Sequence, residues 1–298
     1  MTIETVFAEI VQQVVSKAGS DLYFLPDTQG YRVLFLAGGR RYELRQLSEV
    51  MGMRMVRFIK FQSGMDISET RRPQLGRLFY QMADHDYNCR ISSVGDFLNR
   101  ESIVIRFLYQ LQDVGMRWVD PNQIKKLKEL VKSKSGLILL SGRMGSGKTS
   151  TLYQAIQTEK KERLILSIED PVEIEEPNIL QLQVNELAMM THQSLLKLAL
   201  RHHPEIMIIG EIRDADTAKI VVEAALSGHL ILSTVHATSH VGVWLRMLEL
   251  GVDESSLAHV LIGIGYQQMV QHQCENAVDL EFLQGPEVIE TIQRAQNE

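Results

Sequence analysis

Two different patterns of apolar and polar positions divide this chain. Residues 2–17 and 48–62 carry apolar side chains at helical spacing. The polar face of the first segment has little positive charge, which favours a helix packed on its own domain over one lying on a membrane. The strand candidates are two runs within residues 22–45 and single runs at 74–82, 87–92 and 102–109. This pattern predicts an α+β domain of hairpins and few helices.

After residue 115, short apolar segments alternate with helical ones. Asp120 and Pro121 are typical of a helix N-cap and first position, and they predict a helix that runs to Lys132. The predicted strands are residues 137–140, 164–168, 206–209 and 229–233. Such alternation predicts an α/β domain with a parallel sheet and helices on its faces. We therefore expect an amino-terminal domain at 1–112, a linker at 113–120, and a second domain at 121–298 with a short helical C-terminus.

A complete phosphate-binding loop of the Walker A type, GRMGSGKT, runs from Gly142 to Thr149. A predicted strand precedes it and a predicted helix starts at Ser150, which is the context that this motif requires. Loop amides and the helix N-terminus favour phosphate, Lys148 reaches the β- and γ-phosphates, and the Thr149 hydroxyl ligates Mg²⁺. We predict that the chain binds ATP with Mg²⁺. The phosphate-binding candidates are Gly142, Gly145, Ser146, Gly147, Lys148, Thr149 and Ser150.

Composition narrows the class of protein. A net charge of −6 and a pI near 5.9 disfavour direct DNA binding. Cys89 and Cys274 are far apart and make neither a disulfide framework nor a zinc site. No apolar run approaches the ~20 residues of a membrane span, and the first residues lack the basic region of a signal peptide. We expect a cytoplasmic protein that reaches a membrane only through partners.

Two acidic motifs follow predicted strands. In the motif SIEDPVE, Glu169, Asp170 and Glu173 come where open α/β sheets bind ligands, and where carboxylates can position water or metal. A solvated acidic turn is the alternative, and the motif alone leaves both open. In the motif IMIIGEIRD, four apolar residues precede an acid, as in a Walker B strand. Gly210 occupies the usual aspartate position, so Glu211 is our candidate for polarising the attacking water.

A histidine lies on each side of the apolar strand at 229–233. His229 and His236 fit sensors of the γ-phosphate or of a subunit contact. The alternative for each is an ordinary hydrogen-bonded structural histidine.

With four boxes in this order, the chain resembles the secretion and pilus ATPase superfamily, which includes type II secretion, type IV pilus and competence motors. The Asp, Walker B and His boxes of that family match residues 168–173, 210–214 and 228–236. Residues 64–77 are similar to the family segment that ends in Arg-x-Pro-Gln-Asp-Gly-Arg, except that Leu75 replaces the aspartate. The resemblance covers roughly residues 20–275.

The resemblance implies a RecA-like P-loop ATPase domain preceded by a smaller PAS-like domain, assembled into a homo-hexameric ring. Family arginines on the mobile amino-terminal domain approach the phosphates as arginine fingers do. They match Arg77, Arg90 and Arg106, although each could instead be an exposed strand residue. The implied catalytic set is Glu211, Glu169, Arg77, Arg90, Arg106 and His236. Asp170, Glu173 and His229 join the nucleotide-binding set, and Glu169 and Glu211 assist Thr149 at Mg²⁺ through water.

Departures from the family narrow the subfamily. Many relatives carry a zinc-binding tetracysteine element after the His box, but the matching segment at 261–274 has one cysteine, so we expect no zinc. We also expect no extra amino-terminal domain, and the Ala-Ile-Arg-Asn-Leu-Ile-Arg segment of retraction motors is absent from the sequence. It resembles the competence pseudopilus ATPases of Gram-positive bacteria, which act with a polytopic membrane platform protein at the inner face of the membrane.

We therefore expect a motor that assembles a competence pseudopilus for DNA uptake. The alternatives are a ring-shaped nucleotide-dependent scaffold with little turnover, and an assembly ATPase of a type II secretion or adhesive pilus system. A further alternative is a motor that translocates DNA, which the net negative charge of the chain disfavours.

Overall fold

The computed structural model describes residues 2–37, 40–82, 86–110, 115–272 and 275–297. The chain folds into two compact units, Met1–Tyr109 and Gln110–Glu298. We predicted the boundary slightly further along the chain, and part of that linker lies outside the described residues, as does Cys274.

The first unit is an antiparallel sheet with two helices. Its elements are α1 Ile3–Val15, β1 Asp21–Asp27, β2 Gly30–Ala37, β3 Arg40–Leu47, α2 Glu49–Gln62, β4 Gln74–Gln81, β5 Asp86–Gly95 and β6 Glu101–Gln110. The strands lie in the order β3-β2-β1-β6-β5-β4. We predicted two strands within residues 22–45, but the structure has three strands in this region, β1, β2 and β3. Most side chains of β3 are exposed, so the alternation that marks a half-buried strand is weak there.

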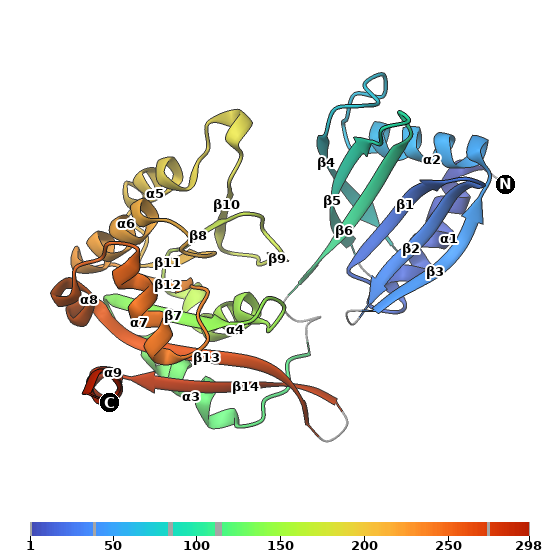
Figure 1. Cartoon of the computed structure of the whole chain (residues 1–298). Helices are drawn as coiled ribbons and strands as arrows, with labels where there is room; N and C mark the ends of the chain where they lie inside the picture. Colours follow the sequence, from blue (N-terminus) through green and yellow to red (C-terminus); the bar gives the residue numbers. More distant parts are fainter. Residues whose placement is uncertain (1, 38–39, 83–85, 111–114, 273–274, 298) are drawn as a thin grey trace. The chain divides into compact units, whose positions relative to one another are not determined.

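Both helices pack on one face of this sheet (Figure 1). The apolar stripe of α1 is buried against the sheet and α2, which confirms that residues 2–17 pack on their own domain. Ser48 caps α2 by accepting a hydrogen bond from the Met51 N–H. Alternate residues of each strand point away from the helices. This second face carries the predicted arginines.

The second unit is an α/β domain. Its elements are α3 Pro121–Leu130, β7 Gly136–Gly142, α4 Lys148–Ala155, β8 Ile165–Glu169, β9 Ile174–Glu175, β10 Leu180–Gln183, α5 His192–Leu200, β11 Ile206–Ile209, α6 Ala215–Leu226, β12 Leu230–Thr234, α7 His240–Glu249, α8 Glu254–Val260, β13 Leu261–His272, β14 Glu275–Gln284 and α9 Pro286–Asn297.

The sheet of this unit has the strand order β10-β8-β11-β12-β7-β13-β14. Neighbouring strands are parallel up to β13, and β14 returns antiparallel, so the prediction of a mainly parallel sheet is confirmed. Every residue of β7, β8, β11 and β12 is buried, because helices cover both faces. Leu137 and Leu139 face one apolar cluster, whereas Ile138 and Leu140 face the other.

The carboxy-terminal region differs from the expectation of a short helical C-terminus. A helix, α9, is present, but the long β13–β14 hairpin precedes it. Glycines let this hairpin pack closely: a Cβ atom on Gly265 would lie 2.4 Å from Leu140 Cδ2. The sequence of residues 261–274 indicates only a segment that leads into the zinc element of relatives, and does not predict this hairpin.

Candidate nucleotide-binding site

The carboxyl ends of four neighbouring parallel strands meet at one edge of the second sheet. The P-loop follows β7, and the carboxylates of Glu169 and Glu211 come at the ends of β8 and β11. His236 follows β12. Ligands of open α/β sheets bind at this edge, so the fold brings four predicted motifs together from segments far apart in the chain.

Glycine is required in the P-loop by its backbone. Gly142, Gly145 and Gly147 have φ angles of 140°, 76° and 84°, a region that other residues rarely adopt. Gly147 occupies the N-cap position of α4 and supplies no side-chain cap. The first N–H groups of the helix therefore lack side-chain acceptors and are available to an anion. The helix starts at Lys148, two residues earlier than we predicted.

Polar groups of the loop fit a phosphate ligand. Lys148 Nζ donates hydrogen bonds to the carbonyl oxygens of Gly142 and Arg143, at 3.0 and 3.1 Å. Burial lowers the pKa of Lys148, and the charges of Glu211 and Glu173 partly oppose this. The Ser146 hydroxyl is buried and has no hydrogen-bond partner among the described residues. An enclosed hydroxyl, a half-buried lysine and open helix amides suit a bound phosphate, and Thr149 in the first turn of α4 could hold the accompanying Mg²⁺.

Glu211 is held between a guanidinium group and a histidine ring. Its Oε1 accepts a hydrogen bond from Arg213, and His236 Nε2 lies 3.1 Å from Oε2. Burial tends to raise the pKa of Glu211, but Arg213 and His236 outweigh this effect and lower it. Oε2 is buried beside the His236 ring. Such a carboxylate is charged at neutral pH and can orient a nucleophile.

The first glutamate of the acidic motif is enclosed. Glu169 Oε1 accepts hydrogen bonds from Tyr153 Oη at 2.6 Å, Ser167 Oγ at 2.7 Å and Gln181 Nε2 at 3.2 Å. Burial raises the pKa of Glu169, although these three donors oppose the rise. Glu169 therefore links β8 to α4 and β10.

The rest of the acidic motif is open to solvent. Asp170 and Glu173 are exposed, and Arg213 Nη1 lies 4.0 Å from Asp170 Oδ2. These two carboxylates, unlike Glu169, can meet a ligand without rearrangement. The metal role that we predicted for Glu169 stays a prediction.

The two histidines of the His box are separated, which corrects one prediction. His236 lies beside Glu211, but His229 precedes β12 at the opposite edge of the sheet. The five residues of β12 separate the two ends by roughly 16 Å, at ~3.3 Å per residue. The His229 ring lies 3.1 Å from the Ala224 carbonyl oxygen, and its own carbonyl accepts the Gly136 N–H. Within one chain, His229 does not line the P-loop, and its role at a subunit contact stays a prediction.

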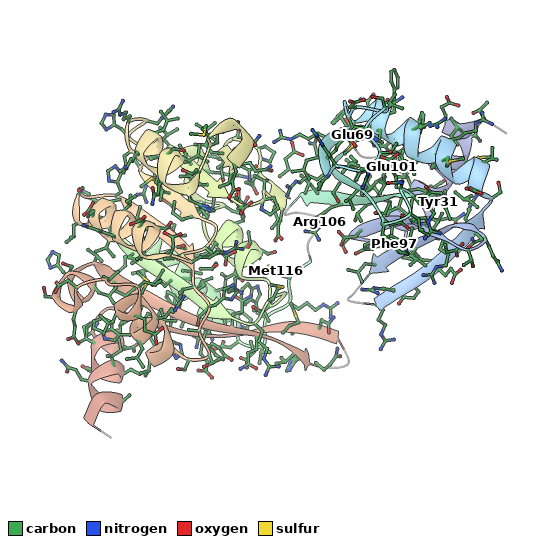
Figure 2. The ribbon with its side chains drawn as sticks, turned by 45° about the horizontal axis from the view of Figure 1, so that its top comes forward. Tyr31, Glu69, Phe97, Glu101, Arg106 and Met116 are labelled. Carbon is green, nitrogen blue, oxygen red and sulfur yellow. The ribbon has the colours of Figure 1, made fainter. Side chains whose placement is uncertain are left out.

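The three predicted arginines form one row across the first sheet. Arg77 of β4 lies opposite Arg90 of β5, which lies opposite Arg106 of β6. Arg106, labelled in Figure 2, also pairs with the buried Asp21 through a 2.7 Å contact from Nε to Oδ1. Paired residues of adjacent strands point to the same face, here the one opposite α1 and α2. Their approach to phosphates stays a prediction.

Sequence reasoning missed Arg213 as a site residue. It lies two residues beyond Glu211 and shares a hydrogen bond with it, and Glu211 raises the pKa of Arg213. Its position just after the carboxyl end of a strand was the available signal. Tyr153 was also missed, because an apolar position within a helix gives no sign of a buried hydrogen bond.

The chain belongs to the type II/IV secretion system protein family, whose sequence profile matches residues 1–297. The resemblance that we inferred from the motifs is thereby confirmed. Among the relatives is the competence protein ComGA of Streptococcus pneumoniae, 38% identical over 269 residues, which are 90% of this chain and 85% of that protein. ComGA of Bacillus subtilis is 34% identical over 277 residues, covering 92% and 78% of the two chains.

The solved structure of the pilus retraction motor PilT with bound ADP is similar in fold. The TM-score is 0.73 over 97% of this chain and 88% of that one, at 21% identity. In the described part of this chain, no helix is long and apolar enough to cross a membrane, and no group of three or more candidate metal ligands occurs. The absence of zinc stays a prediction.

Proposed function

We propose that this protein is an ATP-hydrolysing motor that drives assembly of a competence pseudopilus for DNA uptake. One observation carries the proposal. A P-loop whose buried Ser146 hydroxyl has no partner among the described residues lies at the same sheet edge as the Glu211 carboxylate, which Arg213 and His236 hold. The family and its competence relatives support the coupling to a fibre.

In the proposed reaction, bound MgATP supplies the phosphoryl group that water attacks. Lys148 would exchange its loop carbonyl partners for phosphate oxygens, and Thr149 would hold Mg²⁺. Glu211 orients the attacking water and accepts its proton, because its lowered pKa keeps the carboxylate charged at neutral pH. Asp170 and Glu173, which are both exposed, would supply further carboxylate oxygen atoms to MgATP.

The amino-terminal domain would complete the site in a homo-hexameric ring. The row of Arg77, Arg90 and Arg106 supplies cations on one face, as arginine fingers require. Arg77 and Arg90 are our main candidates, as the family resemblance implies, and Arg106 also pairs with Asp21.

Force would pass to a polytopic platform protein from the cytoplasmic side of the membrane. We place the protein there as a peripheral component without direct DNA contact, consistent with its net charge of −6. An assembly role in type II secretion or adhesive pili uses the same chemistry, and the genes neighbouring this one distinguish these systems.

Steady-state ATP hydrolysis tests the proposal, with the mass of the same samples measured by light scattering. We expect a ring-sized species whose turnover falls at least ~100-fold in Glu211→Gln. Lys148→Ala should abolish turnover as well. Glu223→Gln, an exposed change on α6, is the matched control and should leave the rate within about twofold.

Two results would change this proposal in different ways. Full activity in Glu211→Gln would assign the base to the acidic motif at residues 169–173. A ring that binds ATP without turnover, even with membranes containing the platform protein, would favour the scaffold.

A further inference from the structure

A buried glutamine of β13 lies directly against the P-loop. Gln267 is fully buried, and its Oε1 accepts a hydrogen bond from Thr151 Oγ1 at 2.8 Å. Its Nε2 donates to the Ser146 carbonyl oxygen at 2.5 Å. Ser146 belongs to the loop and Thr151 to α4, so one side chain joins both sides of the Lys148 position from a strand more than 100 residues later in the chain.

Gln267 also limits what two P-loop positions can hold. A Cβ atom on Gly142 would lie 2.0 Å from the Gln267 carbonyl oxygen, which is an impossible contact with backbone. A Cβ atom on Gly147 would lie 3.3 Å from Gln267 Nε2. The loop and β13 are thus fitted closely to each other at Gly142, where β13 pairs in register with the end of β7.

The hydrogen bond to Ser146 fixes a peptide group as well as a carbonyl. A trans peptide is planar, and its C=O and N–H point in opposite directions. With the Ser146 carbonyl held on Gln267, the Gly147 N–H must point away from β13. In our proposed function that direction is toward the phosphates, which the loop amides bind.

We propose that Gln267 is a positioning residue that preorganises the P-loop and thereby sets the affinity for nucleotide. The inference rests on the proposed nucleotide binding. We call the two hydrogen bonds of Gln267, to Ser146 and Thr151, the clamp. Without the clamp, the P-loop must become ordered when the nucleotide binds, and the free-energy cost of that ordering reduces the affinity. The Ser146 carbonyl is also freed to turn toward the phosphates, where its partial negative charge repels them.

Binding of MgADP by the purified full-length chain tests this role. We expect Gln267→Met, which keeps the volume and removes both hydrogen bonds, to raise Kd about tenfold or more. Thr151→Val, which removes only the donor to Oε1, should raise Kd about threefold. Gln268→Met, on the exposed adjacent position of β13, is the matched control and should stay within about twofold of the wild type.

Two readouts separate positioning from general destabilisation. The double variant Gln267→Met/Thr151→Val should bind MgADP as Gln267→Met does, because both changes break the same clamp. KM for ATP should rise more than kcat falls, whereas lost fold stability lowers the active fraction and kcat alone.

The inference is overturned if Gln267→Met binds MgADP within about twofold of the wild type, or if the two single effects multiply in the double variant. Should Gln267→Met fail to fold, Thr151→Val decides: an unchanged Kd overturns the clamp and a raised one supports it. Failure of the folded wild type to bind any nucleotide would instead refute the proposed function.

Discussion

Replacing Lys60 should destabilise the first unit by about 3–4 kcal/mol near pH 7. Lys60 is fully buried in α2, and its Nζ lies 2.5 Å from Glu101 Oε1 and 2.6 Å from the Glu69 carbonyl oxygen. Figure 2 labels these two partners in the first unit. Lys60→Met keeps most of the volume but leaves the buried Glu101 without a counter-charge. Breaking a buried ion pair in this way typically costs about 3–5 kcal/mol.

The positions of the tryptophans give this experiment an internal control. Trp118 and Trp244 are the two tryptophans of the chain, and both belong to the second unit. Urea unfolding followed by tryptophan fluorescence should therefore be unchanged in Lys60→Met. Hydrogen exchange of the β5 and β6 amides should accelerate by a factor equivalent to the lost 3–4 kcal/mol, about 10²–10³.

The double variant Lys60→Met/Glu101→Leu should recover at least half of the loss, because no charge stays buried. A loss below about 1 kcal/mol in Lys60→Met at pH 7 would refute the reasoning.

Three further predictions follow from the site and from one thiol. In Arg213→Gln, loss of the guanidinium charge and its hydrogen bond should raise the pKa of Glu211. The acid limb of the kcat–pH profile should therefore move to higher pH. An unmoved limb would exclude Glu211 as the titrating group. In steady-state assays, His236→Ala should reduce ATP turnover about tenfold, because His236 contacts Glu211. His229→Ala, at the opposite edge of the sheet, should change turnover less than about twofold. Equal losses in the two variants would contradict this placement. Burial raises the pKa of Cys89 to about 12. Iodoacetamide at pH 8 should therefore leave Cys89 unmodified in the native protein and alkylate it in urea, as measured by peptide mass mapping. Rapid alkylation of the native protein would contradict this burial.

Local sequence signals predicted the elements that supply the site. Residues 206–209 are all apolar and form β11 with the predicted bounds, since a strand covered on both faces needs an unbroken apolar run. Asp120 and Pro121 marked the start of α3, where Asp120 accepts the hydrogen bond of the Asn122 N–H. The P-loop could be predicted from its motif, because its glycines adopt positive φ angles that the loop backbone itself requires.

Long-range contacts accounted for what was missed. The β13–β14 hairpin was not predicted, because the glycines in β13 weaken a strand signal. They are explained only by packing against Leu140 and Phe282. In the same way, nothing local distinguishes the buried Lys60 from a surface lysine, since its partner Glu101 lies 41 residues away.

The sequence by itself determined the family, the parallel sheet and the nucleotide loop, because each depends on residue types at short, fixed spacing. The tertiary structure alone decided which polar groups meet. It placed His236 on Glu211 and His229 at the opposite edge, although both flank one strand. It also set Gln267 against the P-loop. The spacing of residue types within a motif can specify one strand or one loop. Contacts between side chains of different strands depend instead on the order of the strands in the sheet.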